Sequence, residues 1–465
     1  MKKRIGFIAM SGVRAHNEEL TKLGLTLPGF VDRNRIIASM PSLGLLTLAG
    51  LTPRERFDVE YHEIADMRKL PEIRTHFDLV AISTFTAQFY EACDVADFYR
   101  AKKIPVVMGG ITASSLPGQT REHCTSVVLG EGEPLWPEVL RDFENGCLKP
   151  VYAQSPPGQF DLRDAPMPRF DLLDPDKYNR LTVQTSRGCP HRCEFCASSI
   201  LLTSRYKVKP VEKVIAEIRE IKKIWPRPFI EFADDNSFVH REHYQRLLRR
   251  LVPEHLRWFT EADVRVAEDD ELLGLMRDSG CQQVLIGLES PPVLRGSTAK
   301  GGRRTNLDGL ELKNNWKARQ QDYYLDAIAK IQSYGITVNG CFILGLDGDT
   351  PEVFDEVLQF VRASGLYEVQ ITFLTAFPGT PLYARLKAEG RILRDQAWEL
   401  CTLFDINFRP ANMSIAELQS GFLRLAKQLY SAEETQNRRR QFKRRLRNST
   451  NFGLRVAPHE QRLAA

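Results

Sequence analysis

Short apolar runs alternate with amphipathic stretches along residues 1–150 of the chain. The apolar runs have the length of strands, and the amphipathic stretches repeat their apolar residues at helical spacing. Such alternation is typical of a parallel, doubly wound α/β sheet of the Rossmann-like kind. The predicted strands are Arg4–Ala9, Asp58–Glu63, Leu79–Thr84, Pro105–Met108 and Ser126–Leu129, and the predicted helices are Leu43–Leu51, Met67–His76, Gln88–Ala101 and Pro134–Asn145.

The same alternation returns over residues 179–400. Six strands in succession, with helices between them, predict a partial (β/α)6 barrel. The functional loops of such a barrel follow the carboxyl ends of its strands. The predicted strands are Leu181–Gln184, Phe229–Ala233, Trp258–Ala262, Gln283–Leu288, Thr337–Leu344 and Glu368–Phe373.

Two segments interrupt or end this alternation. Residues 151–178 contain five prolines and little periodicity, which predicts an extended connector. Residues 401–465 hold a helical pattern at Ile415–Tyr430 and then a basic run, Arg438–Arg447. Nucleic acid, anionic lipid or a phosphorylated substrate could use that run, but a solvated terminal helix is the expected structure. The predicted parts are therefore residues 1–150, 151–178, 179–400 and a helical extension over 401–465.

Composition places the chain among ordinary globular proteins. Its 465 residues can form two or three domains, and 43% are hydrophobic and 26% charged. A net charge of +5 gives no reason to expect a nucleic-acid partner. Nine cysteines in a chain of this length indicate a reducing cytoplasm. The apolar stretch Ile5–Met10 is too short for a signal peptide, and no stretch reaches the length of a membrane span.

Three cysteines lie close together after the first predicted barrel strand. Cys189, Cys193 and Cys196 are spaced four and then three residues apart, so their thiolates can surround one face of an iron–sulfur cube. The fourth iron is then left without a protein ligand and is open to chemistry. Zinc, the weaker alternative, would need a fourth nearby Cys or His to complete a tetrahedron.

This run, with aromatic Phe195 before the third cysteine, resembles the signature of the radical S-adenosylmethionine superfamily. The resemblance implies a 4Fe–4S cluster whose open iron chelates the amino and carboxylate groups of S-adenosylmethionine. One electron from the cluster then cleaves the sulfonium to give a 5′-deoxyadenosyl radical. Loops after later strands resemble further motifs for this cofactor. The S-adenosylmethionine residues implied in this way are Phe195, Asp234, Asp235, Glu261, Glu289, Gly345 and Pro378.

Asp234 and Asp235 follow the second barrel strand, where the superfamily places groups that bind the methionine amino end. A carboxylate at this position suits an ammonium. Replacing both residues with alanine is expected to weaken S-adenosylmethionine binding and to leave the cluster in place. Taken singly, each carboxylate could equally be a structural cap.

The first sheet has no Gly-x-Gly-x-x-Gly after its first strand, which argues against a dinucleotide. A sheet of this size before a radical S-adenosylmethionine core resembles the cobalamin-binding domains of the superfamily's large methyltransferase class. The Asp-x-His-x-x-Gly motif, which places a histidine under cobalt in many cobalamin proteins, is absent. Either cobalamin binds without a protein ligand below cobalt, or the domain has lost the cofactor. The implied cobalamin residues are Ser83, Thr84, Gly109, Gly110, Gly130, Glu131 and Gly132.

The combined resemblance implies an enzyme that methylates an unactivated carbon of a small-molecule, lipid or tetrapyrrole-like substrate. It also implies a low-potential electron donor such as flavodoxin or ferredoxin. The same architecture could perform a ring closure, rearrangement or oxidation without methyl transfer, and an iron–sulfur regulator without catalysis is an alternative of another class. A tRNA methylthiotransferase would need three N-terminal cysteines at a second cluster, and the positions of Cys93, Cys124 and Cys147 do not suit one.

Three further expectations concern segments outside these motifs. The stretch Met10–Pro41 is long for a strand–helix connection and could cap a cofactor or be a plain surface insertion. The polar segment Pro291–Trp316 is expected to be a solvated loop. Cys281 and Cys341 lie in apolar strand patterns and are expected to be small buried side chains.

Overall fold

The computed structural model describes residues 2–12, 15–22, 40–73, 76–198, 203, 205–292, 306–307 and 310–450. Most of Met10–Pro41 and of Pro291–Trp316 therefore lies outside the described residues. The chain divides into two compact units, and each is described by itself. The first comprises Met1–Asn236, Leu310–Lys313 and Phe373–Arg409, and the second comprises Ser237–Gly309, Asn314–Thr372 and Pro410–Ala465.

A six-stranded parallel sheet forms the centre of the N-terminal region, with strand order β2-β1-β3-β4-β5-β6. It confirms the predicted doubly wound sheet. The sixth strand was not predicted, because its three residues fall inside the expected connector. The strands are β1 (Lys3–Met10), β2 (Phe57–Ile64), β3 (Leu79–Ser83), β4 (Val106–Gly109), β5 (Ser126–Leu129) and β6 (Val151–Ala153).

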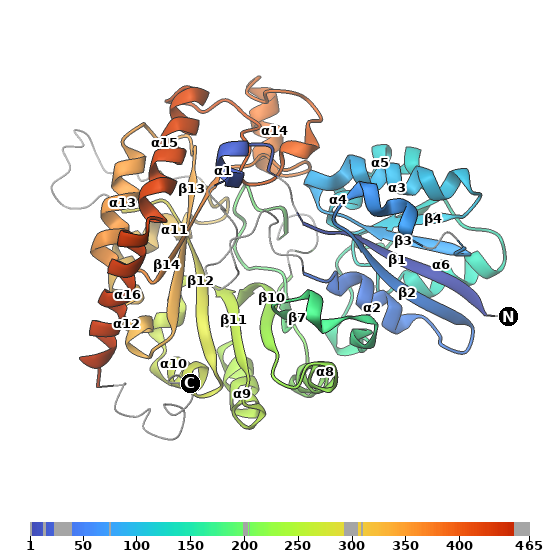
Figure 1. Cartoon of the computed structure of the whole chain (residues 1–465), viewed down its shortest axis with the longest axis horizontal. Coiled ribbons are helices and arrows are strands. Elements are labelled where there is room, and N and C mark those ends of the chain that lie inside the picture. Colours follow the sequence, from blue (N-terminus) through green and yellow to red (C-terminus); the bar gives the residue numbers. More distant parts are fainter. Residues whose placement is uncertain are drawn as a thin grey trace. The chain divides into compact units, whose positions relative to one another are not determined.

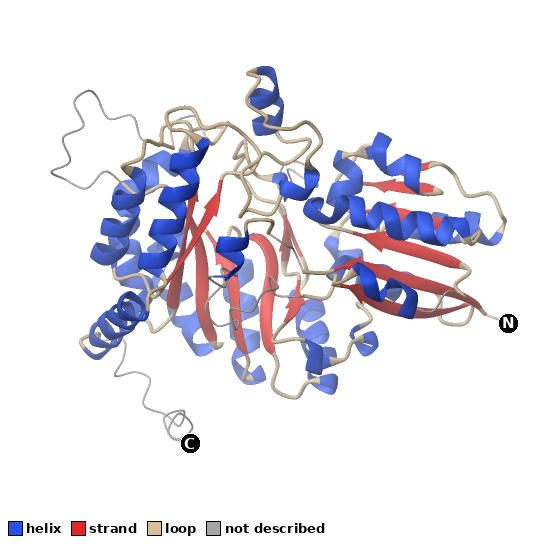
Figure 2. Cartoon of the chain, turned by 45° about the horizontal axis from the view of Figure 1, so that its top comes forward, coloured by secondary structure: helices blue, strands red, loops and turns tan. Residues whose placement is uncertain are grey.

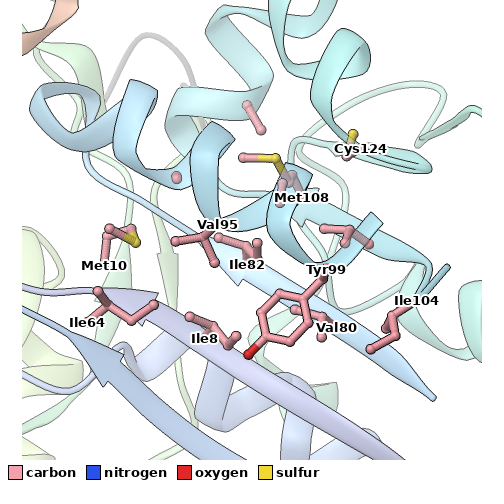
Figure 3. Packing of buried hydrophobic residues seen from close by; sticks show 14 of the residues in the cluster. Ile8, Met10, Ile64, Val80, Ile82, Val95, Tyr99, Ile104, Met108 and Cys124 are labelled. Carbon is pink, nitrogen blue, oxygen red and sulfur yellow. The ribbon is translucent and has the colours of Figure 1, made fainter. Parts of the chain in front are cut away.

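Helices cover both faces of this sheet (Figure 1). Alternate residues of β1 enter different cores: Ile8 packs with residues of α3 on one face, and Phe7 packs with residues of α2 and α6 on the other. Figure 3 shows the first core, in which Val80 and Ile82 of β3 lie beside Tyr99 of α3. Burial on both faces explains why the inner strands β3, β4 and β5 are nearly continuous apolar runs, whereas the edge strand β2 is polar and partly exposed. The helices are α2 (Leu43–Leu51), α3 (Phe89–Ala101), α4 (Ile111–Ser115), α5 (Pro117–His123) and α6 (Trp136–Glu144).

The helix predicted over Met67–His76 is instead a short 3-10 helix, η1 (Met67–Glu72). Asp66 caps its start by accepting a hydrogen bond from the backbone N of Arg68 at 3.0 Å. Pro71 has no backbone N–H to donate, so a regular α-helix is disfavoured through this segment.

A second six-stranded sheet has the order β14-β13-β12-β11-β10-β7 and confirms the six predicted barrel strands. Figure 2 draws the strands in red and the helices in blue. A small antiparallel hairpin of β8 (Ser186–Arg187) and β9 (Lys207–Val208) was not predicted. The sheet strands are β7 (Leu181–Val183), β10 (Phe229–Ser237), β11 (Arg257–Ala262), β12 (Cys281–Glu289), β13 (Thr337–Leu344) and β14 (Glu368–Phe373), and the main helices between them are α8 (Val211–Ile224), α9 (Arg241–Leu251), α10 (Asp270–Asp278), α12 (Tyr324–Ser333) and α13 (Val353–Ser364).

The C-terminal region contains α14 (Pro381–Ala388), α15 (Ile415–Leu429) and α16 (Ala432–Arg447). Neither these nor any other helix in the described ranges is long and apolar enough to cross a bilayer. The expectation that the basic run is simply solvated is wrong for one side of α16. Arg438 is only 2% exposed and donates to the carbonyl oxygen of Leu429 at 2.8 Å. Arg439 forms an ion pair with Glu368 and lies 3.8 Å from the ring centre of Tyr367.

Candidate functional site

The cysteine loop begins directly after β8, at Gly188. Gly188 has a φ of +86°, and a Cβ atom there would lie 2.5 Å from the carbonyl oxygen of Arg205. A side chain at this position would therefore meet both an unfavourable backbone conformation and a backbone collision. Cys189 is the next residue. The close packing at Gly188 therefore fixes the position of the backbone that leads from the hairpin into Cys189.

Asp234, near the end of β10, holds the chain that enters the cysteine loop. Its buried Oδ1 accepts hydrogen bonds from the backbone N of Thr185 at 2.7 Å and of Ser186 at 2.8 Å. Its Oδ2 accepts from the hydroxyl of Thr185. Hydrogen bonds to an ionised carboxylate are stronger than neutral ones, so this contact anchors the loop to the strand. The expected contact of Asp234 with S-adenosylmethionine stays a prediction.

Asp235 contacts both ends of the cysteine loop. Its Oδ2 accepts from the backbone N of Gly188 at 2.6 Å, one residue before Cys189. Its Oδ1 accepts from the hydroxyl of Ser198, two residues after Cys196. One carboxylate thus closes the loop around the three cysteines.

Two distant segments of the first unit also hold the loop. Cys193 pairs with Glu311 in an isolated antiparallel bridge, and Oε1 of the buried Glu311 accepts from the backbone N of Arg192 at 3.1 Å. Glu194 forms an ion pair of 2.7 Å with Arg385 of α14. The segment around Glu311 was expected to be a solvated loop. That expectation is wrong for its described part, which supports the cysteine loop instead.

The three cysteines are free of disulfides; Cys193 is buried, and Cys189 and Cys196 are partly exposed, as is Phe195. Nδ2 of Asn236 donates to the sulfur of Cys189 at 3.8 Å. Burial, with a smaller contribution from the nearby Cys196, raises the pKa of Cys189 to about 11. A thiol in this setting ionises when a metal supplies positive charge, so the three thiols of one loop fit a 4Fe–4S cluster. Among the residues that the structure describes, no three His, Cys, Asp or Glu side chains are grouped around a single-ion position.

In the second unit, Glu289 ends β12 with a φ of +60°, which is uncommon for a residue that carries a side chain. The pairing of β12 with β13 shifts between Gly287 and Glu289, and a bulge of this kind re-aims a side chain. The carboxylate forms an ion pair with Lys317, whose Nζ also donates to the carbonyl oxygen of Gly287 at 3.1 Å. Backbone strain of this kind collects at functional sites, and the contact of Glu289 with S-adenosylmethionine stays a prediction.

Cys341 is partly exposed, so the expectation of a buried side chain is wrong for this residue. Desolvation, followed by the charges of Glu261 and Glu289, raises its pKa well above the usual value. Glu261 itself is exposed at the end of β11. Cys281, by contrast, is buried as expected. Cys341 therefore lies outside the fully buried core of the second unit, whereas Cys281 lies within it.

Gly345 and Pro378 lie in turns of different units. The backbone N of Gly345 donates to Oδ2 of Asp349 at 2.9 Å in the second unit. Pro378 is buried in the first unit, within a turn in which the hydroxyl of Thr380 donates to the carbonyl oxygen of Phe377 at 2.7 Å. Both turns have defined backbone geometry, and their contacts with S-adenosylmethionine stay predictions.

The ends of β3, β4 and β5 form the carboxyl edge of the first sheet. Ser114 of α4 joins two of these ends: its hydroxyl donates to the carbonyl oxygen of Gly110 and accepts from the backbone N of Gly130, both at 2.8 Å. A Cβ atom at Gly130 would meet nothing within 4 Å, so space is open there. Ligands of such sheets bind beyond this edge. The predicted cobalamin residues at the edge are Ser83, Thr84, Gly109, Gly110 and Gly130.

Glu131 and Gly132 continue the loop after β5, but the side chain of Glu131 is already occupied. It is 1% exposed and accepts hydrogen bonds from Arg187 and Lys207, each at 2.8 Å. A Cβ atom on Gly132 would lie 3.4 Å from Leu48. The backbone of this loop, rather than the Glu131 carboxylate, is what remains to approach a ligand.

Phe85 is a residue of this edge that the sequence analysis missed. It follows β3 by two positions and its side chain is 58% exposed, unlike the buried aromatic residues of the same sheet. The sequence feature that could have identified Phe85 is its place as an aromatic residue just beyond the end of a predicted strand. An exposed ring offers a flat apolar surface to a large ligand.

Three family models match the chain. The "Radical SAM superfamily" model matches residues 183–361, the "B12 binding domain" model residues 34–140, and a "Domain of unknown function (DUF4070)" residues 380–464. The chain is a cobalamin-binding radical S-adenosylmethionine protein. The matches confirm the predicted enzyme class and its three cofactors: the 4Fe–4S cluster, S-adenosylmethionine and cobalamin.

Curated relatives of this radical S-adenosylmethionine protein include bacteriochlorophyllide d C-12(1)-methyltransferase of Chlorobaculum tepidum, 26% identical over 86% of this chain and 84% of that protein. Hopanoid C-2 methylase of Rhodopseudomonas palustris is 28% identical over 77% of this chain and 67% of its own. The methyltransferase TsrM of Kitasatospora setae, solved with cobalamin and a 4Fe–4S cluster, has a TM-score of 0.64 and 17% identity over 96% of this chain and 99% of that one. This last likeness confirms the fold.

We expect the reconstituted protein to bind about one cobalamin per chain, with Phe85 against the macrocycle. Phe85→Ala should weaken hydroxocobalamin binding about tenfold, because it removes a large apolar contact. Equilibrium dialysis measures this, and Tyr90→Ala, which removes another exposed ring of the same domain, is the control. The cob(II)alamin electron-spin resonance spectrum should lack nitrogen splitting from a protein histidine; such splitting would contradict the prediction.

Proposed function

We propose that this protein methylates an unactivated carbon of a small-molecule, lipid or tetrapyrrole-like substrate. The observation that carries the proposal is that the sheet with the B12-domain match and the cysteine loop belong to one compact unit. The relatives named as a bacteriochlorophyllide methyltransferase and a hopanoid methylase support it. When bound, the cofactors supply a radical that activates the substrate carbon and a methyl group that is transferred to it.

The residues of the chain would contribute position and charge. Asp234 and Asp235 hold the cysteine loop, and the amide of Asn236 reaches the sulfur of Cys189. In the second unit, the Glu289–Lys317 pair presents fixed charges at a strand end. Fixed donors and acceptors orient a polar cofactor without reorganising when it binds.

A second candidate is a radical ring closure, rearrangement or oxidation without methyl transfer. The anaerobic magnesium-protoporphyrin IX monomethyl ester cyclase of Rubrivivax gelatinosus is 23% identical over 74% of this chain and 64% of its own length. That relative is named for a cyclisation, so the shared architecture does not require methylation.

We expect the reconstituted holoenzyme to transfer one deuterated methyl group from methyl-labelled S-adenosylmethionine to a substrate. Bacteriochlorophyllides and hopanoids are the first substrates to test under reducing, anaerobic conditions, with mass spectrometry of the products. Protein without cobalamin should still cleave S-adenosylmethionine but yield no methylated product. A cyclised or oxidised product without the label would favour the second candidate, and no cleavage at all would favour a regulator.

The proposed partner in the cell is a low-potential electron donor such as flavodoxin or ferredoxin. Reduction of a 4Fe–4S cluster in this class requires an external electron of low potential. A cytoplasmic location is proposed with it, since the described cysteines are all free thiols.

A further inference from the structure

Two cations of the first unit lie directly opposite each other on the β8–β9 hairpin. Arg187 and Lys207 are cross-strand partners, and like charges in this arrangement destabilise a hairpin. The carboxylate of Glu131 neutralises part of this repulsion, because it binds both cations. Its Oε1 accepts from Arg187 at 2.8 Å and from Lys207 at 2.8 Å, and its Oε2 accepts from Lys207 at 3.0 Å. Glu133 adds a second bond to Arg187 at 2.6 Å, so the four charges balance.

These charges are largely removed from water. The side chain of Glu131 is 1% exposed, that of Lys207 12% and that of Arg187 13%. Burial alone would raise the pKa of Glu131, but hydrogen bonds from Lys207 and Arg187 bring it below its ordinary value. Charges in such a setting are screened little, and loss of one leaves its partners uncompensated.

The two ends of this network lie beside different cofactor regions. Glu131 stands between Gly130 and Gly132, in the loop after β5 at the ligand edge of the first sheet. Arg187 stands two residues before Cys189, and Gly188 between them is held by Asp235. A shift of the β5 loop therefore moves the carboxylate that neutralises the hairpin, and the hairpin leads directly into the first cysteine.

We propose that Glu131 is a positioning residue that couples cobalamin binding at the sheet edge to assembly of the cluster in the cysteine loop. The coupling rests on the proposed placement of cobalamin beyond β3, β4 and β5. Each cofactor orders one end of the network and so favours the geometry that the other needs. Coupling between binding sites is reciprocal, so cobalamin must favour the cluster by the same factor as the cluster favours cobalamin.

The test measures the dissociation constant of hydroxocobalamin by equilibrium dialysis with cobalt analysis. It compares chelator-stripped protein with cluster-reconstituted protein. The wild type should bind at least about fivefold more tightly when the cluster is present. In Glu131→Gln the ratio of the two constants should fall to about one, because a neutral amide cannot neutralise both cations.

Two further variants keep the test decisive. Glu131→Gln combined with Lys207→Met restores the charge balance and so protects folding, but its ratio should also be about one. Glu231→Gln breaks another buried ion pair of the first unit, with Arg180, and should keep the wild-type ratio.

A wild-type ratio near one, or an unchanged ratio in both Glu131 variants, would overturn the proposal. So would loss of the ratio in Glu231→Gln, since general destabilisation would then explain the effect. If neither the chelator-stripped nor the cluster-reconstituted protein binds hydroxocobalamin, then cobalamin does not bind at the sheet edge. The proposed coupling is then also wrong.

Discussion

Replacing Cys189, Cys193 and Cys196 together with alanine should abolish both the iron–sulfur absorbance and the production of deoxyadenosine. The three thiols lie on one loop and are free of disulfides. A cluster that loses all three thiolates has no protein ligand left in this loop. Iron analysis and the visible absorbance of the protein measure the cluster, and chromatography after reduction measures deoxyadenosine.

The matched control is Cys147→Ala, which removes an exposed thiol of the same unit. It should leave iron content and S-adenosylmethionine cleavage unchanged. Full iron content in the triple variant would contradict the assignment of the cluster. Retained iron with lost cleavage would point to a metal held elsewhere.

Asp235→Ala should release the cluster about tenfold faster or more than the wild type does, which replaces the expectation from the sequence that loss of this carboxylate leaves the cluster in place. The substitution leaves the backbone N–H of Gly188 and the hydroxyl of Ser198 without their carboxylate partner on the two sides of the cysteines. An unmet hydrogen-bond donor away from water costs about 1–3 kcal/mol, and the loop that carries the cysteines would loosen. Iron loss to a chelator, followed over time, measures the effect.

The comparison with Asp235→Asn separates two roles of this residue. An asparagine keeps one oxygen for the backbone N of Gly188, so it should retain the cluster better than alanine. If Asp235 instead serves only the methionine ammonium, both variants should hold iron like the wild type and bind S-adenosylmethionine more weakly. The second outcome would contradict a loop-holding role.

The sequence predicted the longer elements well because their signals are local. Strands such as β13 (Thr337–Leu344) and β5 (Ser126–Leu129) are rich in apolar residues, and their observed bounds match the prediction. The missed strands β6, β8 and β9 have only two or three residues, too few for any period to show. Their pairing is decided by tertiary contacts.

In the candidate site too, features with a local sequence signal were predicted, and features set by tertiary contacts were missed. The cysteines were found because their spacing carries the chemistry within a few residues. Glu131 was predicted as a cobalamin residue, but its side chain binds Arg187, which is 56 residues away in the sequence. Arg438 was expected in solvent, yet a carbonyl oxygen nine residues earlier and close packing bury it. Partners at such separations leave no local pattern to read.

The support of the cysteine loop from distant segments sets an order for biosynthesis. Glu194 is held by Arg385, which is 191 residues later in the chain. At a ribosomal rate of ~5–20 residues per second, roughly 10 to 40 s pass between the synthesis of these two residues. During that interval the three thiols are already made while α14 is not. Cluster insertion that needs this ion pair therefore cannot precede the synthesis of α14, and until then the nascent thiols depend on the reducing power of their surroundings.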